Sequence, residues 1–396
     1  MKKETRVVHP AEVELPEGNR PLVSPIYRTV KFTYPTIADS LGEEARRHGF
    51  DYTRDSNPTT RELERLVARL QDRDDAIAVA TGMAAVWLTL LGTLEAGDRV
   101  VIFVESYRPA RVAVRKFLPR FDIEFSMLGI HDLEAIEREF ARPDTKLVLF
   151  EAPTNPMLHV PDIAAIVELA RRHDVITVLD NTFAGLHNHG KFDIDYYVHS
   201  LTKYANGHGD AMGGAVIADE RRIKALRAQA VNLGATMDPG VSYLIMRGLK
   251  TYYLRYERHC ENALAVARYL AARPEVEQVF YPGLPEHAGH ALAARQMDDF
   301  GGVLSFDLRG DKAATLAFID ALELFAATSS LGSIDSLVAP VELYYSGDLS
   351  PDERARAGIR ESSVRLAIGV EHVDDLIADL AQALDKIGTG TRDPGP

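Results

Sequence analysis

Hydrophobic positions in the first two thirds of the chain follow two alternating patterns. Short apolar runs typical of buried strands cover residues 76–79, 99–104, 123–128, 146–150 and 175–179. Amphipathic helical patterns cover residues 60–71, 83–94, 112–118 and 163–172. Because strands that alternate with helices form right-handed βαβ units, we expect an α/β fold. Its central sheet is expected to be mostly parallel, with helices on both faces.

The last third of the chain has a different pattern. One long helical pattern covers residues 243–272 and ends before Pro274. After it, strand patterns at 276–281, 303–308 and 364–368 alternate with helical patterns at 313–321 and 374–387. This arrangement predicts a smaller C-terminal α+β domain.

The residues before the first helical pattern are rich in Pro, Arg and Glu and have weak periodicity. They predict an extended arm with one short helix. We therefore expect three parts: an arm over residues 1–55, an α/β domain over 56–245, and an α+β domain over 246–396.

The amino-acid composition argues against several classes of function. The chain has 45 Lys and Arg against 58 Asp and Glu, a net charge of −13, which argues against nucleic-acid and anionic-membrane partners. No apolar run is long enough to span a membrane, and the first residues do not resemble a signal peptide. The single cysteine, Cys260, excludes a zinc site with several Cys ligands and fits a reducing cytoplasm. We expect a soluble cytoplasmic protein with no metal site.

Polar residues follow three of the predicted strands, at the edge where α/β proteins bind ligands. The first is the turn at Gly82 and Met83, which suits a phosphate or is a plain tight turn. The second is Asp180, which is a helix cap, a metal ligand or a partner for a protonated ring nitrogen. The third is Lys203, which is a Schiff-base amine or a lysine extended towards solvent. Considered singly, Asp180 and Lys203 are better explained by their structural roles, whereas the turn at Gly82 fits both interpretations equally.

A nucleotide site has less support. The glycine-rich segment 207–214 does not fit the GxGxxG pattern, and the chain has no GxxxxGK[ST] loop. An NAD-dependent oxidoreductase is therefore a remote alternative. A phosphate-binding turn, a carboxylate and a lysine at neighbouring strand ends are together what pyridoxal 5′-phosphate (PLP) requires.

Several ordered motifs point to one family. They lie at residues 52–59, 81–85, 151–156, 180–183, 200–204 with 207–210, 330–332, and 364–366 with 369–371. With these motifs the chain resembles the transsulfuration enzymes of cysteine and methionine metabolism, a family of fold-type I PLP enzymes. The resemblance extends from residue 25 to about residue 384.

The resemblance implies roles around the cofactor ring. Lys203 is expected to hold the cofactor aldehyde as a Schiff base and to move protons between substrate carbons. Asp180 is expected to pair with the pyridine nitrogen, and Asn155 to bind the phenolic oxygen of the ring. Tyr107 is expected to stack on the ring, to contact the substrate and to assist proton transfer.

The resemblance also implies binding sites for the phosphate and the substrate. Arg365 is expected to bind the substrate α-carboxylate as a bidentate fork, with Ser330 beside it. The phosphate is expected to contact Gly82, Met83, Ser200 and Thr202 of one subunit, and Tyr52 and Arg54 of its neighbour. A site shared in this way requires at least a dimer, and the family implies a homotetramer built from dimers.

The implied activity is elimination of a leaving group from Cγ or Cβ of an amino acid, most plausibly a sulfur amino acid. The products are a 2-oxo acid and ammonia, as in methionine γ-lyases and cystathionine lyases. The alternative is γ-replacement on an O-acylhomoserine, as in cystathionine γ-synthases and sulfhydrylases. Two departures from the family pattern leave the substrate open: Arg108-Pro109 after Tyr107, and the segment 341–345.

Overall fold

The computed structural model describes residues 2, 15–42, 49–345 and 347–388. A seven-stranded sheet has the order β1-β7-β6-β5-β4-β2-β3. Its strands are β1 (Asp75–Val79), β2 (Arg99–Phe103), β3 (Glu124–Leu128), β4 (Thr145–Glu151), β5 (Ile176–Asp180), β6 (Tyr196–Ser200) and β7 (Gly214–Ala218). Pairings from β6 through β3 are parallel, and β7 is antiparallel to both its neighbours. The predicted mostly parallel sheet is confirmed.

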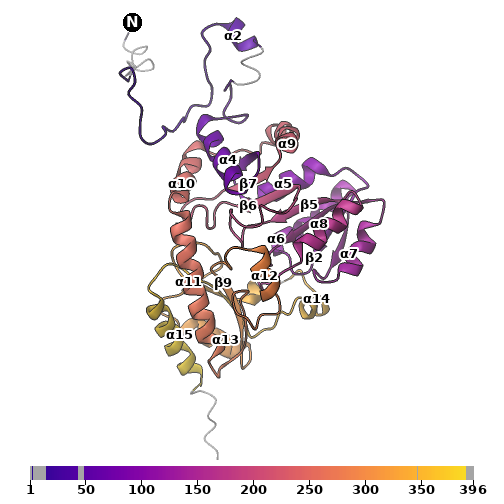
Figure 1. Ribbon diagram of the computed structural model, residues 1–396, viewed down its shortest axis with the longest axis vertical. Coiled ribbons are helices and arrows are strands. Elements are labelled where there is room, and N and C mark those ends of the chain that lie inside the picture. Colours follow the sequence, from indigo (N-terminus) through magenta and orange to yellow (C-terminus); the bar gives the residue numbers. More distant parts are fainter. Residues whose placement is uncertain (1, 3–14, 43–48, 346, 389–396) are drawn as a thin grey trace, which may run out of the picture.

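Helices cover both faces of this sheet (Figure 1). One face packs against α4 (Pro58–Leu70), α7 (Leu133–Phe140), α8 (Ile163–Arg172) and α10 (Pro239–Leu249). The other packs against α5 (Gly82–Thr93), α6 (Arg108–Val112) and α9 (Glu220–Leu233). The strands bury alternate residues on each side: Ala76 and Ala78 belong to the first layer, Ile77 and Val79 to the second.

A second, five-stranded sheet has the order β10-β11-β12-β9-β8. Its strands are β8 (Val276–Phe280), β9 (Val303–Leu308), β10 (Ala326–Ala327), β11 (Leu337–Pro340) and β12 (Ser363–Ala367). A core of its own joins it to α11 (Tyr252–Ala271), α13 (Lys312–Ala321) and α15 (Val373–Gly388). The shorter helices of this region are α12 (His290–Gln296), the 3₁₀ turn η3 (Val341–Tyr344) and α14 (Pro351–Arg356).

The prediction of a single helix over residues 243–272 is wrong, because the structure has two helices there: α10 ends at Leu249 and α11 begins at Tyr252. The two helices meet where Gly248 packs against the backbone of Asn206, so closely that a Cβ would lie 2.1 Å from its carbonyl oxygen. Arg255 holds the junction by donating to the carbonyl oxygen of Gly248 at 2.9 Å and to Thr251 Oγ1 at 3.1 Å. Hydrophobic periodicity continues through this break and does not reveal it.

The helix predicted over 112–118 also differs in form. α6 begins earlier and is continued by a π-helical segment, η1 (Ala113–Phe117), and a 3₁₀ segment, η2 (Leu118–Phe121). Pro119 lies in the first turn of η2 and lacks the N–H that a regular helix would need.

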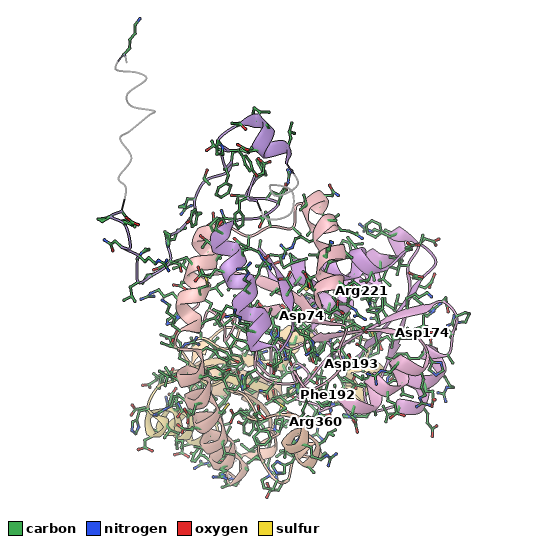
Figure 2. All side chains as sticks on the ribbon, turned by 45° about the horizontal axis from the view of Figure 1, so that its top comes forward. Asp74, Asp174, Phe192, Asp193, Arg221 and Arg360 are labelled. Atoms are coloured by element: carbon green, nitrogen blue, oxygen red, sulfur yellow. The ribbon has the colours of Figure 1, made fainter. Side chains whose placement is uncertain are left out.

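The described part of the first 55 residues extends away from the body of the protein (Figure 1). It contains the short helix α2 (Ile37–Leu41), whose N-terminus is capped by Thr36. One isolated bridge between Lys31 and Tyr52 pairs its outgoing and returning segments. Figure 2 shows the same separation with all described side chains drawn. Among the described residues, no helix is both long and apolar enough to cross a bilayer.

Candidate active site

A cavity of about 410 Å³ opens at the carboxyl ends of β4, β5 and β6, where Arg365 of β12 also reaches it. Ten of the twelve site residues expected from the sequence line this cavity. They are Gly82, Met83, Tyr107, Asn155, Asp180, Ser200, Thr202, Lys203, Ser330 and Arg365. The structure thus brings together residues that are more than 280 positions apart in the chain.

Lys203 lies in the turn that follows β6, three residues beyond its last residue. Its Nζ donates to Ser330 Oγ at 2.8 Å. Burial, together with the positive charge of Arg365, lowers the pKa of Lys203 to about 8. At neutral pH this lysine has a far larger neutral fraction than an ordinary lysine, and the neutral amine is a nucleophile and a base.

Two buried carboxyl groups end adjacent strands beside this lysine. Asp180 closes β5 and its Oδ1 accepts from Thr182, from the backbone N–H at 3.1 Å and from the hydroxyl at 2.6 Å. Glu151 closes β4 and accepts from the N–H of Tyr107 and, at 3.2 Å, from the N–H of Asn155. Burial raises the pKa of both carboxyls, and the charge of Asp180 further raises that of Glu151, which reaches about 8.

The N-terminus of α5 forms a cradle for an anion. Thr81 caps the helix by accepting from Ala84 N at 3.0 Å, which leaves the N–H groups of Gly82 and Met83 free for a ligand. A Cβ on Gly82 would lie 2.8 Å from Ser200 Cβ, so only glycine lets the helix end approach this strand. Thr202 completes the rim, with its hydroxyl paired to the backbone of Gly213.

Arg365 projects into the cavity from β12 and is only 3% exposed. It donates to Asn155 Oδ1 at 2.9 Å and to the carbonyl oxygen of Ser330 at 2.5 Å, while its buried Nε has no partner. Burial lowers the pKa of this guanidinium. A buried cation with an unused donor is suited to bind a carboxylate.

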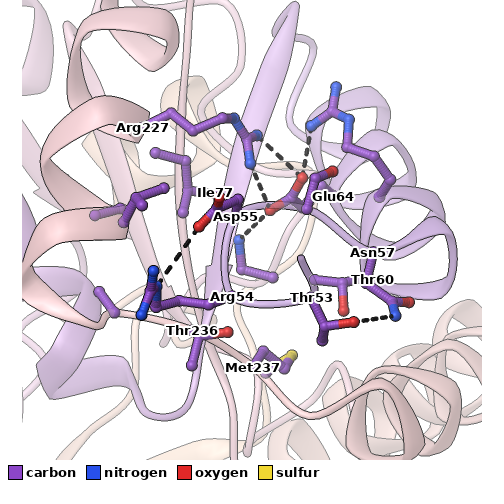
Figure 3. Close-up of a pocket in the computed structure, with 16 residues that line it drawn as sticks. Thr53, Arg54, Asp55, Asn57, Thr60, Glu64, Ile77, Arg227, Thr236 and Met237 are labelled. Atoms are coloured by element: carbon purple, nitrogen blue, oxygen red, sulfur yellow. Dashed lines mark hydrogen bonds and ion pairs between the residues drawn. The ribbon is translucent and has the colours of Figure 1, made fainter. Parts of the chain in front are cut away.

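Tyr52 and Arg54 do not join this cavity within one chain. Arg54 instead lies 3.5 Å from Asp55 and over the ring of Tyr52, at 4.9 Å from its centroid. It lines a separate polar pocket between the arm, α4 and α9, where Glu64 binds Arg227 (Figure 3).

The cavity residues that the sequence did not assign include Glu151, Thr182 and Tyr344. Glu151 had a usable signal, because it closes a strand just as Asp180 does. Thr182 follows Asp180 at the spacing of an Asx turn. Tyr344 had no such signal, because η3 belongs to the region where the sequence departs from the family pattern.

A family model described as Cys/Met metabolism PLP-dependent enzyme matches residues 4–385. The chain belongs to this family. It is 38% identical over 389 residues to an L-methionine gamma-lyase of Pseudomonas putida, with 96% of each chain covered. It is 35% identical over 384 residues to an O-succinylhomoserine sulfhydrylase of Pseudomonas aeruginosa, covering 96% of this chain and 94% of that one.

Two solved structures of related enzymes have the same fold as this chain. A cystathionine gamma synthase from Xanthomonas oryzae pv. oryzae, in complex with aminoacrylate and cysteine, superposes with a TM-score of 0.88 at 34% identity. The match covers 93% of this chain and 94% of that chain. MetB from Corynebacterium glutamicum superposes with a TM-score of 0.86 at 31% identity, covering 98% of each chain. The fold-type I expectation is confirmed, and this chain is a PLP-dependent enzyme of cysteine and methionine metabolism.

The cavity fits the cofactor of this family. The free N–H groups at Gly82 and Met83 suit its phosphate, and Asp180 suits a protonated ring nitrogen. Lys203 suits its aldehyde. The glycine-rich segment 207–214 leads into β7 and opens no helix, so the nucleotide alternative lacks the helix N-terminus that it needs.

Proposed function

We propose that this enzyme is a carbon–sulfur lyase that removes a Cγ or Cβ leaving group from a sulfur amino acid, giving a 2-oxo acid and ammonia. The single observation that carries the proposal is the position of Lys203. Its amine has a lowered pKa, donates to Ser330 and lies in the cavity that the carboxyl pair and Arg365 also line. Bound PLP supplies the electron withdrawal that makes the substrate Cα–H acidic.

In the proposed reaction, Arg365 binds the substrate, and Lys203 and Tyr107 transfer protons. Arg365 binds the substrate α-carboxylate, and its contacts with Asn155 and Ser330 fix the orientation of the guanidinium. Lys203 Nζ then accepts the proton from Cα. Elimination at Cγ requires a second proton to leave Cβ. Lys203 can accept this proton only after it has donated the Cα proton onward and is neutral again. Tyr107, which lines the cavity and is 37% exposed, assists in moving protons.

Product analysis tests the proposal. The holoenzyme is incubated in turn with methionine, cystathionine, cysteine and an O-acylhomoserine, and the 2-oxo acid is identified by mass spectrometry. Release of 2-oxobutanoate supports Cγ elimination, and pyruvate from cystathionine or cysteine supports Cβ elimination. Absence of any 2-oxo acid from all four compounds contradicts a lyase.

A second candidate is γ-replacement on an O-acylhomoserine. It is favoured by the identity to the sulfhydrylase and by the superposition on cystathionine gamma synthase. The two activities differ only in whether a thiol adds before the product leaves. Supplying sulfide or cysteine with the O-acylhomoserine separates them, because a synthase then forms a new thioether or thiol at the expense of 2-oxobutanoate.

The proposed assembly is a homotetramer built from dimers, in which Tyr52 and Arg54 of one subunit bind the phosphate in the neighbouring subunit. Both residues lie outside the cavity of their own chain, which supports a site completed by another copy. Apolar side chains of the arm are exposed in the single chain: Leu22, Val23, Ile26, Tyr27 and Val30. The domain limits at residues 55 and 245 and the cytoplasmic location stay predictions from the sequence.

A further inference from the structure

Tyr344 lies in the cavity without a role in the reaction described so far. β11 pairs with β12 so that Ala339 lies opposite Arg365 and Pro340 opposite Val364. The chain therefore leaves the sheet next to Arg365, and the single turn of η3 places Tyr344 on the guanidinium. The distance from Arg365 Cζ to the centroid of the Tyr344 ring is 4.1 Å. This stacking fixes the plane of the guanidinium.

The hydroxyl of Tyr344 is the second observation. Tyr344 is 8% exposed, and its buried hydroxyl has no hydrogen-bond partner among the described residues. Such groups are rare in folded proteins because burial without a partner is unfavourable. Arg365 Nε, on the side chain that the ring covers, is also buried without a partner. Two donors without acceptors, on side chains that stack on each other, point to a ligand that supplies several acceptors, as a carboxylate does.

A buried ion pair holds the segment that carries Tyr344. Asp348 accepts from Arg111 at 2.9 and 3.3 Å, and the side chains of both residues are 2% exposed. Arg111 also donates to the carbonyl oxygen of Tyr344 at 3.1 Å. Arg111 belongs to α6, which begins directly after Tyr107. The Arg111 guanidinium thus joins α6, which follows Tyr107, to the segment that carries Tyr344.

We propose that Tyr344 is a further substrate-binding residue, whose hydroxyl donates to the α-carboxylate beside Arg365. The Arg111–Asp348 pair acts as a positioning pair that keeps the hydroxyl aimed at this carboxylate. The proposal rests on the proposed role of Arg365 as the carboxylate-binding residue. It concerns a group that every amino-acid substrate has, so it holds for elimination at Cβ, elimination at Cγ and γ-replacement alike.

The test uses two probes that carry no leaving group. Glycine has an α-carboxylate and methylamine has none, and both amines change the absorbance of the PLP-loaded enzyme on binding. We expect Tyr344→Phe holoenzyme to bind glycine about tenfold more weakly, the loss expected for one hydrogen bond to a charged group. Methylamine binding is expected to stay within about twofold of wild type, because its complex does not use the hydroxyl. Leu343→Ala is the matched control, since this neighbouring side chain is 54% exposed on the same turn.

Two further variants separate the possible failures. Arg365→Lys is expected to weaken glycine binding selectively; if it does not, both the role of Arg365 and the proposal fail. If Arg365→Lys weakens glycine binding and Tyr344→Phe does not, only the Tyr344 proposal is overturned. Equal weakening of glycine and methylamine in Tyr344→Phe also overturns it, because that result indicates a general change of the cavity.

The positioning role of the Arg111–Asp348 pair is tested separately, by comparing the dissociation constants of glycine and methylamine. Asp348→Asn is expected to weaken glycine binding and leave methylamine binding near its wild-type value, while Tyr344 itself is intact. A variant that only melts at a lower temperature, with the ratio of the two dissociation constants unchanged, shows that the pair is structural. That outcome overturns its positioning role.

Discussion

Glu151 and Asp180 lie opposite one another at paired positions on β4 and β5. Both carboxyls are buried, and the charge of Asp180 raises the pKa of Glu151 to about 8. Repulsion between two carboxylates this close favours a single proton on the pair. The remaining negative charge fits the proposed role of Asp180 as the partner of a protonated ring nitrogen. Glu151 accepts from the N–H groups of Tyr107 and Asn155.

This pair predicts a pH dependence for the stability of the apoprotein. The pKa of Glu151 is raised on folding from 4.5 to about 8, so the unfolded chain releases this proton at lower pH. The contribution of Glu151 to stability is complete below about pH 4.5 and is lost as the pH rises towards about 8. We expect Glu151→Gln, which does not titrate, to flatten the fall in melting temperature between these limits.

The quantity compared is the slope of melting temperature against pH. A substitution that lowers the melting temperature equally at every pH leaves this slope unchanged. Glu353→Gln is the control, because burial, which raises the pKa of Glu353, is outweighed by the hydrogen bonds from Ser350 and Arg115 that lower it. Glu353 lies on α14 and does not line the cavity. Calorimetry measures the melting temperatures of the wild-type, Glu151→Gln and Glu353→Gln apoproteins between about pH 4.5 and about pH 8. Parallel slopes for wild type and Glu151→Gln would show that Glu151 ionises at its ordinary pKa.

Lys203 predicts a pH dependence for cofactor loading. Only its neutral amine attacks an aldehyde, and its pKa is about 8 instead of 10.5. The rate at which apoenzyme binds PLP covalently is expected to rise with pH through a midpoint near 8, measured by stopped-flow absorbance. Arg365→Leu is expected to move the midpoint upward, because the charge of Arg365 contributes to the shift. A midpoint near 10 in the wild type contradicts the burial of this amine.

Gly82→Ala tests the phosphate cradle. The added Cβ would lie 2.8 Å from Ser200 Cβ, so the end of α5 and the strand must separate. Overpacking of this kind costs about 1–3 kcal/mol, and we expect PLP affinity to fall by about tenfold or more. Thr93→Ala, at the far end of the same helix, is the control. Equilibrium dialysis of PLP measures both, and an unchanged affinity for Gly82→Ala contradicts phosphate binding at this turn.

The sequence predicts much of this arrangement because local rules apply to it. Alternating patterns define the parallel sheet, and its carboxyl edge identifies Gly82, Asp180 and Lys203 as neighbours before any contact is known. The resemblance adds Arg365, which no local pattern connects to a cavity built mainly by another sheet. Tyr344 could not be predicted, because its position depends on strand pairing between β11 and β12 and on a buried ion pair across 237 residues.

Sharing of the active site between subunits is the last prediction. Lys203→Ala removes the amine and is expected to abolish turnover and the yellow absorbance of the lysine-bound cofactor. Arg54→Ala is expected to weaken PLP binding in the neighbouring subunit. Each variant alone is therefore inactive or nearly so at limiting PLP. After the two are mixed, unfolded and refolded together, hybrid dimers contain one site with both Lys203 and Arg54.

Random pairing in a two-fold dimer makes half of the dimers hybrids with one complete site each, so activity is expected to return to about one quarter of wild type. Arg120→Ala mixed with Lys203→Ala is the control: Arg120 is a surface residue in η2, and the hybrid gains no site beyond those of the Arg120→Ala subunits. The activity of both refolded mixtures is measured at limiting PLP, where loss of Arg54 is expected to have its largest effect. If the mixture of Arg54→Ala and Lys203→Ala stays as inactive as its parents although hybrids form, Arg54 serves its own subunit or no phosphate at all.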